Sequence, residues 1–202
     1  MVDINGKRFV DEGEDFFSYT YAKCGREVLR LPWRTAYQVF DSKTRPLLRS
    51  EYNRGFHVSA ESIEALAKKL PGLNWENVVS TVNEFNGAVN DAPFDPSKHD
   101  GKFTHGISPV KSNWAQPLDA PPFYAFPVTC GITFTFGGIG ITERSEVKDT
   151  TDNVISGLFA AGEITGGSFF NNYPGGSGLM KGAVFGRLAG TSAANFAKAK
   201  RA

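Results

Sequence analysis

Residues 157–190 read GLFAAGEITGGSFFNNYPGGSGLMKGAVFGRLAG, and this stretch decides the fold that we expect. The apolar run at 158–161 predicts a short strand, and Glu163 follows it closely. Sheets that alternate with helices bind ligands beyond the carboxyl ends of their strands. A carboxylate at this place can accept hydrogen bonds from a ribose diol, whereas a strand-end glutamate that points at water gives the same pattern.

A glycine-rich loop and a long helix come next. The loop reads YPGGSGL at residues 173–179, and the apolar positions that follow predict a helix over residues 177–197. Unpaired N–H groups at a helix N-terminus suit an anion, or an oxygen that gains negative charge during a reaction. The pyrimidine carbonyl of a flavin becomes such an oxygen on reduction.

Glycine recurs every four residues along the predicted helix, at Gly178, Gly182, Gly186 and Gly190. One stripe of the helix therefore has no side chains, and a flat ring or another backbone can lie against it. A glycine inside a helix costs about 1 kcal/mol relative to alanine, so we expect a packing or cofactor requirement behind the pattern. Close packing of the helix on a strand is the alternative explanation.

The overall composition excludes several classes of partner. The chain has 22 Lys and Arg residues against 21 Asp and Glu residues, which gives no reason to expect nucleic acid as a partner. Cys24 and Cys130 stand in no ligand spacing, nor do His57, His99 and His105, so we expect no metal site. No apolar run is long enough to span a membrane, and we expect a soluble, cytoplasmic chain.

The first half of the chain predicts a mixture of helices and strands. Asn5-Gly6 is a strong turn signal, and the alternation around it predicts a hairpin over residues 2–10. The elements expected after it are a helix that stops before Pro32, a strand over 35–40, and amphipathic helices over 60–70 and 75–89, the second with Asn74 as its N-cap.

The second half predicts a change of structure. Residues 91–122 are rich in proline and polar residues, and we interpret them as a long connection between two domains. Strands are expected beyond this connection, over 123–129, 132–136 and 139–141 and around Val147.

Several motifs in a fixed order resemble one known family. They are NGKRFVDE at residues 5–12, GITFTFGG at 131–138 and the strand, loop and helix of 157–190. Together they resemble the fumarate reductase/succinate dehydrogenase flavoprotein superfamily over nearly the whole chain. In that family a dinucleotide-binding fold with a glycine-rich fingerprint precedes a capping domain, and the chain then completes the FAD domain. No such fingerprint occurs here, so we expect a member without its N-terminal half, which would be its partner.

The resemblance implies an α+β fold with two parts. Residues 1–122 are expected to form a substrate-capping domain with helices, a small sheet and a linker. Residues 123–202 are expected to form the C-terminal strands and long helix of an FAD-binding domain. FAD is the implied cofactor. By position, the resemblance implies that Glu163 contacts the FAD ribose. It also implies that the flavin ring is contacted by Gly176, Ser177, Gly178, Leu179 and Phe134.

The substrate ligands of fumarate reductases do not carry over to this chain. Thr133 and Tyr173 stand where those enzymes resemble one another in having a histidine and an arginine, and Phe16 stands at the place of their proton-delivering arginine. Threonine and tyrosine donate hydrogen bonds but carry no compensating charge for a dicarboxylate. We therefore do not expect fumarate reduction.

The segments 9–16 and 19–23, together with 131–136, look closer to tricarballylate dehydrogenase-like enzymes, and ketosteroid dehydrogenases also resemble the chain at residues 173–175. Either branch implies desaturation of a small organic acid or ketone beside its carboxylate or carbonyl, in which a base takes a proton and the flavin takes a hydride. The candidates for catalysis are Tyr173, Tyr19, Tyr21 and Arg26, and those for substrate binding are Thr133, Tyr173 and Lys23.

Each candidate has a simpler reading, in which Tyr173 packs before Pro174, and Lys23 and Arg26 are solvated. At the level of the whole chain, the alternative is a non-catalytic domain that retains the fold without flavin. On the main hypothesis, these 202 residues alone are inactive, because half of the cofactor site is absent.

Overall fold

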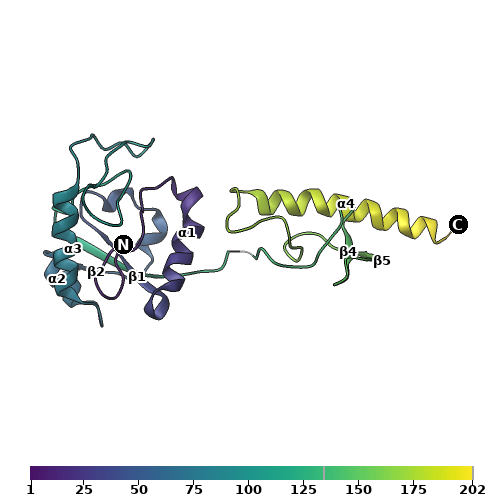
Figure 1. The fold of residues 1–202 in the computed structure, drawn as a ribbon, viewed down its shortest axis with the longest axis horizontal. Helices are drawn as coiled ribbons and strands as arrows, with labels where there is room; N and C mark the ends of the chain where they lie inside the picture. Colours follow the sequence, from purple (N-terminus) through teal and green to yellow (C-terminus); the bar gives the residue numbers. More distant parts are fainter. Residues whose placement is uncertain (134, 202) are drawn as a thin grey trace. The chain divides into compact units, whose positions relative to one another are not determined.

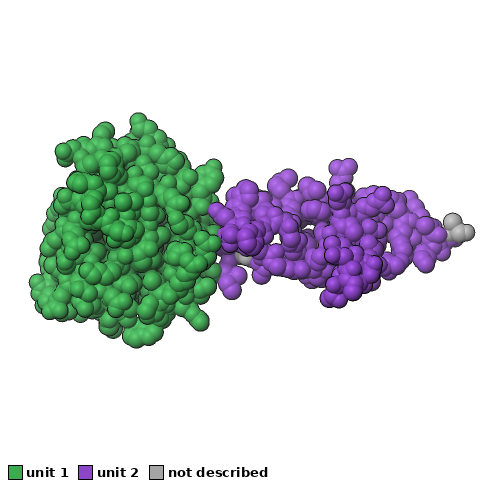
Figure 2. Space-filling model, viewed as in Figure 1, with its two compact units in different colours: residues 1–131 green, residues 132–202 purple. Residues whose placement is uncertain are grey.

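The computed structural model describes residues 1–133 and 135–201. The chain divides into two compact units, Met1–Gly131 and Ile132–Ala202, which Figure 2 colours green and purple. Both units mix helices with small sheets, as the expected α+β class requires.

The sheet of unit 1 has three strands in the order β1-β3-β2. β1 (Thr35–Phe40) and β2 (Val58–Ala60) both pair antiparallel with the central strand β3 (Phe123–Thr129). Phe40 lies opposite Tyr124 in this register. The strand expected over 123–129 therefore completes the sheet of unit 1 and does not open the second part of the chain.

Three helices belong to unit 1: α1 (Phe17–Arg30), α2 (Ile63–Lys68) and α3 (Trp75–Ala88). Figure 1 shows α2 and α3 side by side next to the sheet. Their starts follow from capping, since Ser62 accepts the N–H of Ala65 and Asn74 accepts that of Asn77. Three short 3-10 turns follow α1 or β1, at Pro32–Arg34, Arg45–Leu47 and Ser50–Asn53.

The core of unit 1 forms where α2 and α3 meet the sheet. Its buried members are Val2, Tyr37, Leu66, Ala67, Leu70, Leu73, Val78, Val82, Phe123 and Ala125. The apolar stripes that predict the two helices supply half of these residues, so those stripes are core faces.

The segment 91–122 is part of unit 1, and its interpretation as a connection between domains is wrong. The Asp100 carboxylate accepts the backbone N–H groups of Lys102 and Trp114, each at 2.9 Å. Lys102 in turn donates through Nζ to the carbonyls of Asn90 (3.0 Å) and Ala92 (2.8 Å). Prolines exclude regular elements here, but side-chain hydrogen bonds hold the irregular backbone in place.

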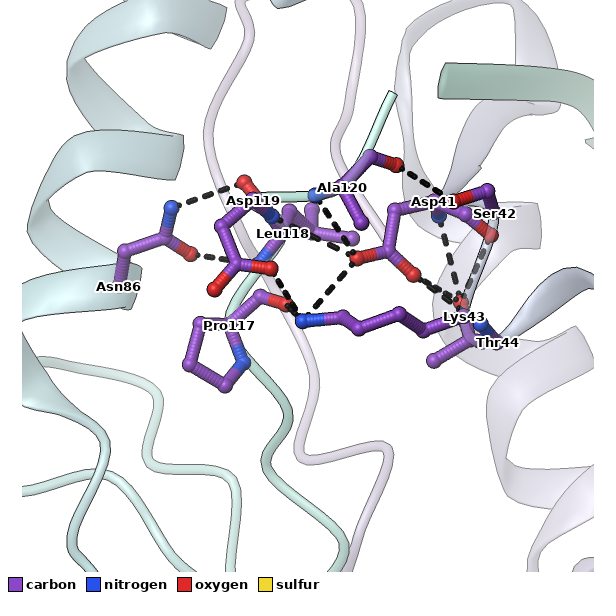
Figure 3. Close-up of polar contacts among 9 residues, drawn as sticks. All are labelled: Asp41, Ser42, Lys43, Thr44, Asn86, Pro117, Leu118, Asp119 and Ala120. Atoms are coloured by element: carbon purple, nitrogen blue, oxygen red, sulfur yellow. Dashed lines mark hydrogen bonds and ion pairs between the residues drawn. The ribbon is translucent and has the colours of Figure 1, made fainter. Parts of the chain in front are cut away.

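A buried carboxylate fixes the end of this segment to the end of β1 (Figure 3). Asp41 is fully buried, and its Oδ1 accepts the N–H (3.0 Å) and hydroxyl (2.9 Å) of Thr44. Its Oδ2 accepts the N–H groups of Asp119 and Ala120, both at 3.4 Å, and lies 3.4 Å from Lys43 Nζ. Residues 119–120 are thereby held beside β1 before the chain enters β3, so the units divide after residue 131 and not at the expected 122.

The predicted hairpin over residues 2–10 is also wrong, although its turn forms. Gly6 adopts a φ of 74° and donates to the carbonyl of Asp3 at 3.0 Å. Val2 then pairs with Tyr37 of β1 and not with a second arm of its own. Addition to an existing sheet satisfies the backbone of Val2 better than an isolated two-stranded hairpin would.

Unit 2 contains a two-stranded sheet and one long helix. β4 (Glu146–Lys148) pairs antiparallel with β5 (Val154–Phe159), and α4 runs over Ser177–Ala199. The predicted helix is confirmed, whereas the predicted strand lies earlier than expected, at 154–159. The strand expected over 139–141 is reduced to isolated bridges of Ile139 and Ile141, and the described residues of 132–136 form no strand.

The apolar residues of unit 2 are mostly exposed. No described residue of α4 is buried, and five of the six positions of β5 are exposed. The helix does contact the strand at one end, because the rings of Phe159 and Phe196 lie 6.2 Å apart. Among the helices that the structure describes, none has the length and apolar character of a membrane span.

Candidate cofactor and substrate site

The Glu163 turn, residues 162–167, follows β5 and positions an exposed carboxylate. Gly162 begins the turn with a φ of 82°, a conformation that favours glycine. Glu163 Oε1 accepts the backbone N–H of Thr135 at 3.1 Å. The other oxygen has no protein partner among the described residues. The carboxylate is thus oriented by one bond and keeps acceptor capacity for a ligand.

The start of α4 leaves backbone donors open. Its N-cap, Gly176, is left-handed (φ 80°, ψ −11°), and no side chain caps the helix. The Ser177 hydroxyl donates back to the carbonyl of Pro174 at 2.5 Å instead of accepting a helix N–H. Within the described part of the chain, the N–H groups of Gly178 and Leu179 have no acceptor. An uncapped helix start of this kind can bind an oxygen that carries negative charge.

Two predicted substrate residues meet at the Tyr173 loop, which comprises residues 168–176. The hydroxyl oxygens of Thr133 and Tyr173 lie 3.3 Å apart, within hydrogen-bonding distance, although 40 residues separate them in sequence. The rings of Phe136 and Phe169 flank that of Tyr173, with centroids at 5.9 Å and 6.0 Å. Tyr173 therefore sits in an aromatic cluster with its hydroxyl beside a second hydroxyl. Phe134, the other predicted flavin neighbour, lies outside the described residues.

The glycine stripe of α4 faces open space. A methyl group built on Gly182, Gly186 or Gly190 would meet no atom within 4 Å. Close packing of these three glycines on a strand of unit 2 is therefore excluded for the described residues. The close helix–strand contact involves Gly157 of β5, where such a methyl group would lie 3.0 Å from Phe196.

The remaining predicted residues lie on α1 of unit 1, and their side chains are engaged there. Lys23 forms an ion pair with Glu14, and Arg26 lies 3.7 Å from Glu27. Tyr21 stacks on Phe17 at 5.3 Å, and Tyr19 is 63% exposed. Lys23 is not simply solvated as in the simpler reading, because its ammonium forms an ion pair with Glu14.

Two cations that the sequence did not single out stand beside aromatic rings. Arg45 lies over Tyr124 (5.6 Å) and Phe126 (5.5 Å) in unit 1, and donates through Nη2 to Asn53 at 2.9 Å. A guanidinium with donors to spare can pair with a carboxylate. Lys181 of α4 has a similar setting in unit 2, over Phe169. No spacing in the sequence could reveal either cluster, because each is built from distant segments.

A buried charge cluster holds the first segment of unit 1. Burial by itself raises the pKa of Glu12, but the Met1 amine, Lys111 and Arg8 outweigh this effect and lower the pKa to about 2. Arg8 Nη2 lies 2.6 Å from Glu12 Oε2. Burial also lowers the pKa of Lys111. These groups join residues 8–12 to residues 109–111, so we assign them to the scaffold of unit 1.

Comparisons with known proteins show which family the chain belongs to. A family model described as an FAD binding domain matches residues 1–179. The chain belongs to this FAD-binding family. It is 33% identical over 98% of its length to an NADH:fumarate oxidoreductase of Klebsiella pneumoniae (strain 342), of which it covers 20%.

Two solved structures extend the likeness to the fold. One is the open conformation of a flavocytochrome c3 fumarate reductase, with 30% identity, a TM-score of 0.69, and coverage of 97% of this chain and 32% of that one. The other is a 3-ketosteroid-delta4-(5alpha)-dehydrogenase from Rhodococcus jostii RHA1, with 29% identity, a TM-score of 0.65 and coverage of 96% and 38%. The chain thus spans less than two fifths of the length of each protein named here. It is a member of the flavoprotein superfamily that its motifs resemble.

The residues of unit 2 fit FAD, the cofactor of the family. Glu163 offers an oriented, exposed carboxylate, and the start of α4 offers N–H groups without acceptors. The open glycine stripe leaves space beside the helix. Acceptors for a ribose and donors for the pyrimidine oxygens are the groups that this part of a flavin site needs.

Proposed function

We propose that this chain supplies the substrate-capping domain and the isoalloxazine side of the flavin site in an FAD-dependent oxidoreductase. The reaction is oxidation or reduction of a CH–CH bond next to a carboxylate or carbonyl. The observation that carries the proposal is the grouping, within one compact unit, of the Glu163 carboxylate, the uncapped start of α4 and the Tyr173–Thr133 hydroxyl pair.

The cofactor side of the proposal assigns a role to each group of unit 2. Glu163 accepts hydrogen bonds from the FAD ribose, and residues 176–179 donate N–H groups to the pyrimidine end of the ring. When bound, the flavin supplies the acceptor or donor of a hydride. Donors fixed in advance favour the oxygen that becomes negative, because they need no reorganisation during the reaction.

The substrate side rests on Tyr173 and Thr133. Their hydroxyls lie close enough to bind one oxygen of a substrate together, and both groups are neutral donors. A tyrosine hydroxyl beside a carbonyl oxygen stabilises negative charge on that oxygen and can move a proton to or from it. A tricarballylate-like organic acid is the substrate class that we favour, as the likeness of residues 9–23 suggests.

A cyclic ketone is the second candidate substrate. Two phenylalanine rings flank the ring of Tyr173, which gives this ring apolar neighbours. The likeness to a 3-ketosteroid dehydrogenase at 29% identity supports the same reading. An acid requires a cation in addition to the two hydroxyls, whereas a ketone does not, so the charge of the preferred substrate separates the two candidates.

The capping role that we propose for unit 1 rests on helix α1. Tyr19, Tyr21, Lys23 and Arg26 all lie on α1. Tyr19 and Tyr21 carry hydroxyls that can donate to a substrate oxygen, while Lys23 would first have to leave Glu14. Arg45, with its guanidinium held over two rings, is an additional candidate for a carboxylate ligand in this unit.

We further propose that the remainder of the FAD domain covers the open faces of unit 2. Leu179, Val184 and Leu158 are all largely exposed, on α4 and β5. Apolar surface of this extent favours burial against a partner. The relatives are several times longer than this chain, which leaves room for a dinucleotide-binding half in a protein of that length.

The test is the absorbance spectrum of the 202-residue chain before and after FAD is added and the sample desalted. A second sample adds the dinucleotide-binding half of a relative as a separate polypeptide. Glu163→Gln should weaken retention of flavin about tenfold, the value of one charge-assisted hydrogen bond. Glu143→Gln is the matched control, since Glu143 is another exposed glutamate of unit 2.

The outcomes separate the enzyme from the non-catalytic domain. Flavin that survives desalting in either sample, and is lost in the Glu163 variant alone, supports the proposal. Absence of flavin from both samples would reject it and favour a domain that retains the fold without the cofactor.

A further inference from the structure

Lys181 connects the two segments that carry the candidate cofactor contacts. It lies on α4 one turn beyond Ser177, and its half-buried ammonium donates to the backbone carbonyl of Thr165 in the Glu163 turn. The same ammonium lies 5.8 Å from the ring centroid of Phe169 in the Tyr173 loop. One side chain thus contacts the Glu163 turn and the Tyr173 loop from the helix.

Thr165 is the fixed point of the Glu163 turn. It is fully buried, and its hydroxyl and N–H both donate to the carbonyl of Gly162, at 2.8 Å and 3.2 Å. It also pairs with Ile139 in a parallel bridge, in which Gly166 donates to the Ile139 carbonyl at 3.1 Å. A hydrogen bond to the Thr165 carbonyl therefore restrains the position of the whole turn, including Glu163.

The bond from Lys181 has no substitute in the surrounding structure. Among the described residues, no other hydrogen bond joins residues 162–167 to α4. An ammonium bonded to a carbonyl is a charge-assisted contact, stronger than a neutral one. The distance between the Glu163 carboxylate and the N–H groups at the start of α4 then depends on this lysine.

We propose that Lys181 is a positioning residue, which holds the Glu163 turn and the Phe169 ring against α4 so that both ends of the flavin contact are set before the cofactor binds. This inference rests on the proposed function, because the value of the arrangement lies in flavin binding. Preorganisation of this kind raises affinity by reducing the ordering that binding requires.

Amide hydrogen exchange of the 202-residue chain tests, without any cofactor, whether Lys181 holds the Glu163 turn against α4. Lys181→Met keeps the length and apolar stem but removes the donor, and Lys181→Arg restores a donor. Lys198→Met, on the last turn of the same helix, is the matched control. The amides of Thr165 and Gly166 should exchange about tenfold faster in Lys181→Met, while the other two variants keep wild-type rates. Lys181→Gln replaces the Met variant if that variant does not fold.

Flavin affinity and the position of the flavin absorbance bands are the second readout, measured with the dinucleotide-binding half of a relative present. Lys181→Met should weaken binding about tenfold and shift the bands, with recovery in Lys181→Arg. Unchanged exchange, or faster exchange with unchanged flavin affinity, would overturn the inference. A wild-type chain that binds no flavin would instead reject the proposed function. The exchange rates alone would then decide whether Lys181 holds the Glu163 turn against α4.

Discussion

Unit 1 and unit 2 differ in where they place their apolar residues. Apart from Val147, every buried apolar residue that the structure describes lies in unit 1. Unit 2 has a 23-residue helix without one buried position and a strand that is exposed along most of its length. Burial of apolar area is the main favourable term in folding, so unit 1 has its own source of stability, whereas unit 2 by itself buries little apolar area.

The largest expected effect comes from removing a core side chain of unit 1. Leu66 is 1% exposed at the centre of the core, and Leu66→Ala should lower the free energy of unfolding by about 2–5 kcal/mol. Leu158→Ala in β5 is the control in unit 2, with an expected effect within about 0.5 kcal/mol in the same chain. Urea unfolding followed by circular dichroism measures both. Equal losses would show that unit 2 has a core of its own.

A second prediction uses the charge cluster of unit 1. The pKa of Glu12 is lowered from 4.5 to about 2 in the folded chain, so the unfolded chain binds the proton more tightly. The stabilisation is therefore complete above pH 4.5 and is lost as the pH falls towards 2, with a total on the order of 3 kcal/mol. Urea unfolding between pH 2 and pH 6 should show this slope in the wild type and a flatter one in Glu12→Gln. A variant as steep as the wild type would contradict the assignment.

The smallest effect concerns the glycine stripe in unit 2. Gly186→Ala should stabilise α4 by about 1 kcal/mol in this chain, because the new methyl group meets no atom within 4 Å. If the stripe serves a backbone or ring outside this chain, the same change should weaken flavin retention in the sample that contains the dinucleotide-binding half. Helix content by circular dichroism measures the first effect and absorbance after desalting the second. Higher helix content with undiminished flavin retention would show that Gly186 makes no close contact with a backbone or ring outside this chain.

Local signals predicted several of the elements correctly, although the hairpin over 2–10 and the strand over 139–141 did not form. The strand bounds 35–40 and 123–129 agree with the structure, and Asn74 caps α3 as expected. Alternation, capping residues and proline positions are properties of neighbouring residues, and these suffice to place an element.

Long-range pairing is where the sequence failed. Nothing near residues 123–129 indicates that their partners are β1 and β2, more than 60 residues earlier, and so the strand was assigned to the wrong part. The prolines of 91–122 concealed an ordered segment for the same reason, since its backbone N–H groups donate to side chains outside it, such as those of Asn90 and Asp41.

The candidate site shows the same division. Glu163 and the start of α4 were found because strand ends and helix starts can be read from local sequence. The approach of Thr133 to Tyr173 required the resemblance to a family, and the contacts of Lys181 with Thr165 and Phe169 required the structure. Side chains that act through a neighbouring loop leave no spacing in the sequence that would predict them.

The bridge between Val2 and Tyr37 has a consequence for solubility during folding. Tyr37 belongs to β1, an outer strand of its sheet, and exchanges both backbone hydrogen bonds with Val2 (2.8 Å and 2.9 Å). Unprotected outer strands recruit strands of other molecules and begin aggregation. Residues 1–7 therefore protect the edge of β1 from pairing with another molecule. A form of the chain that lacks them should self-associate through β1 even if its core remains intact.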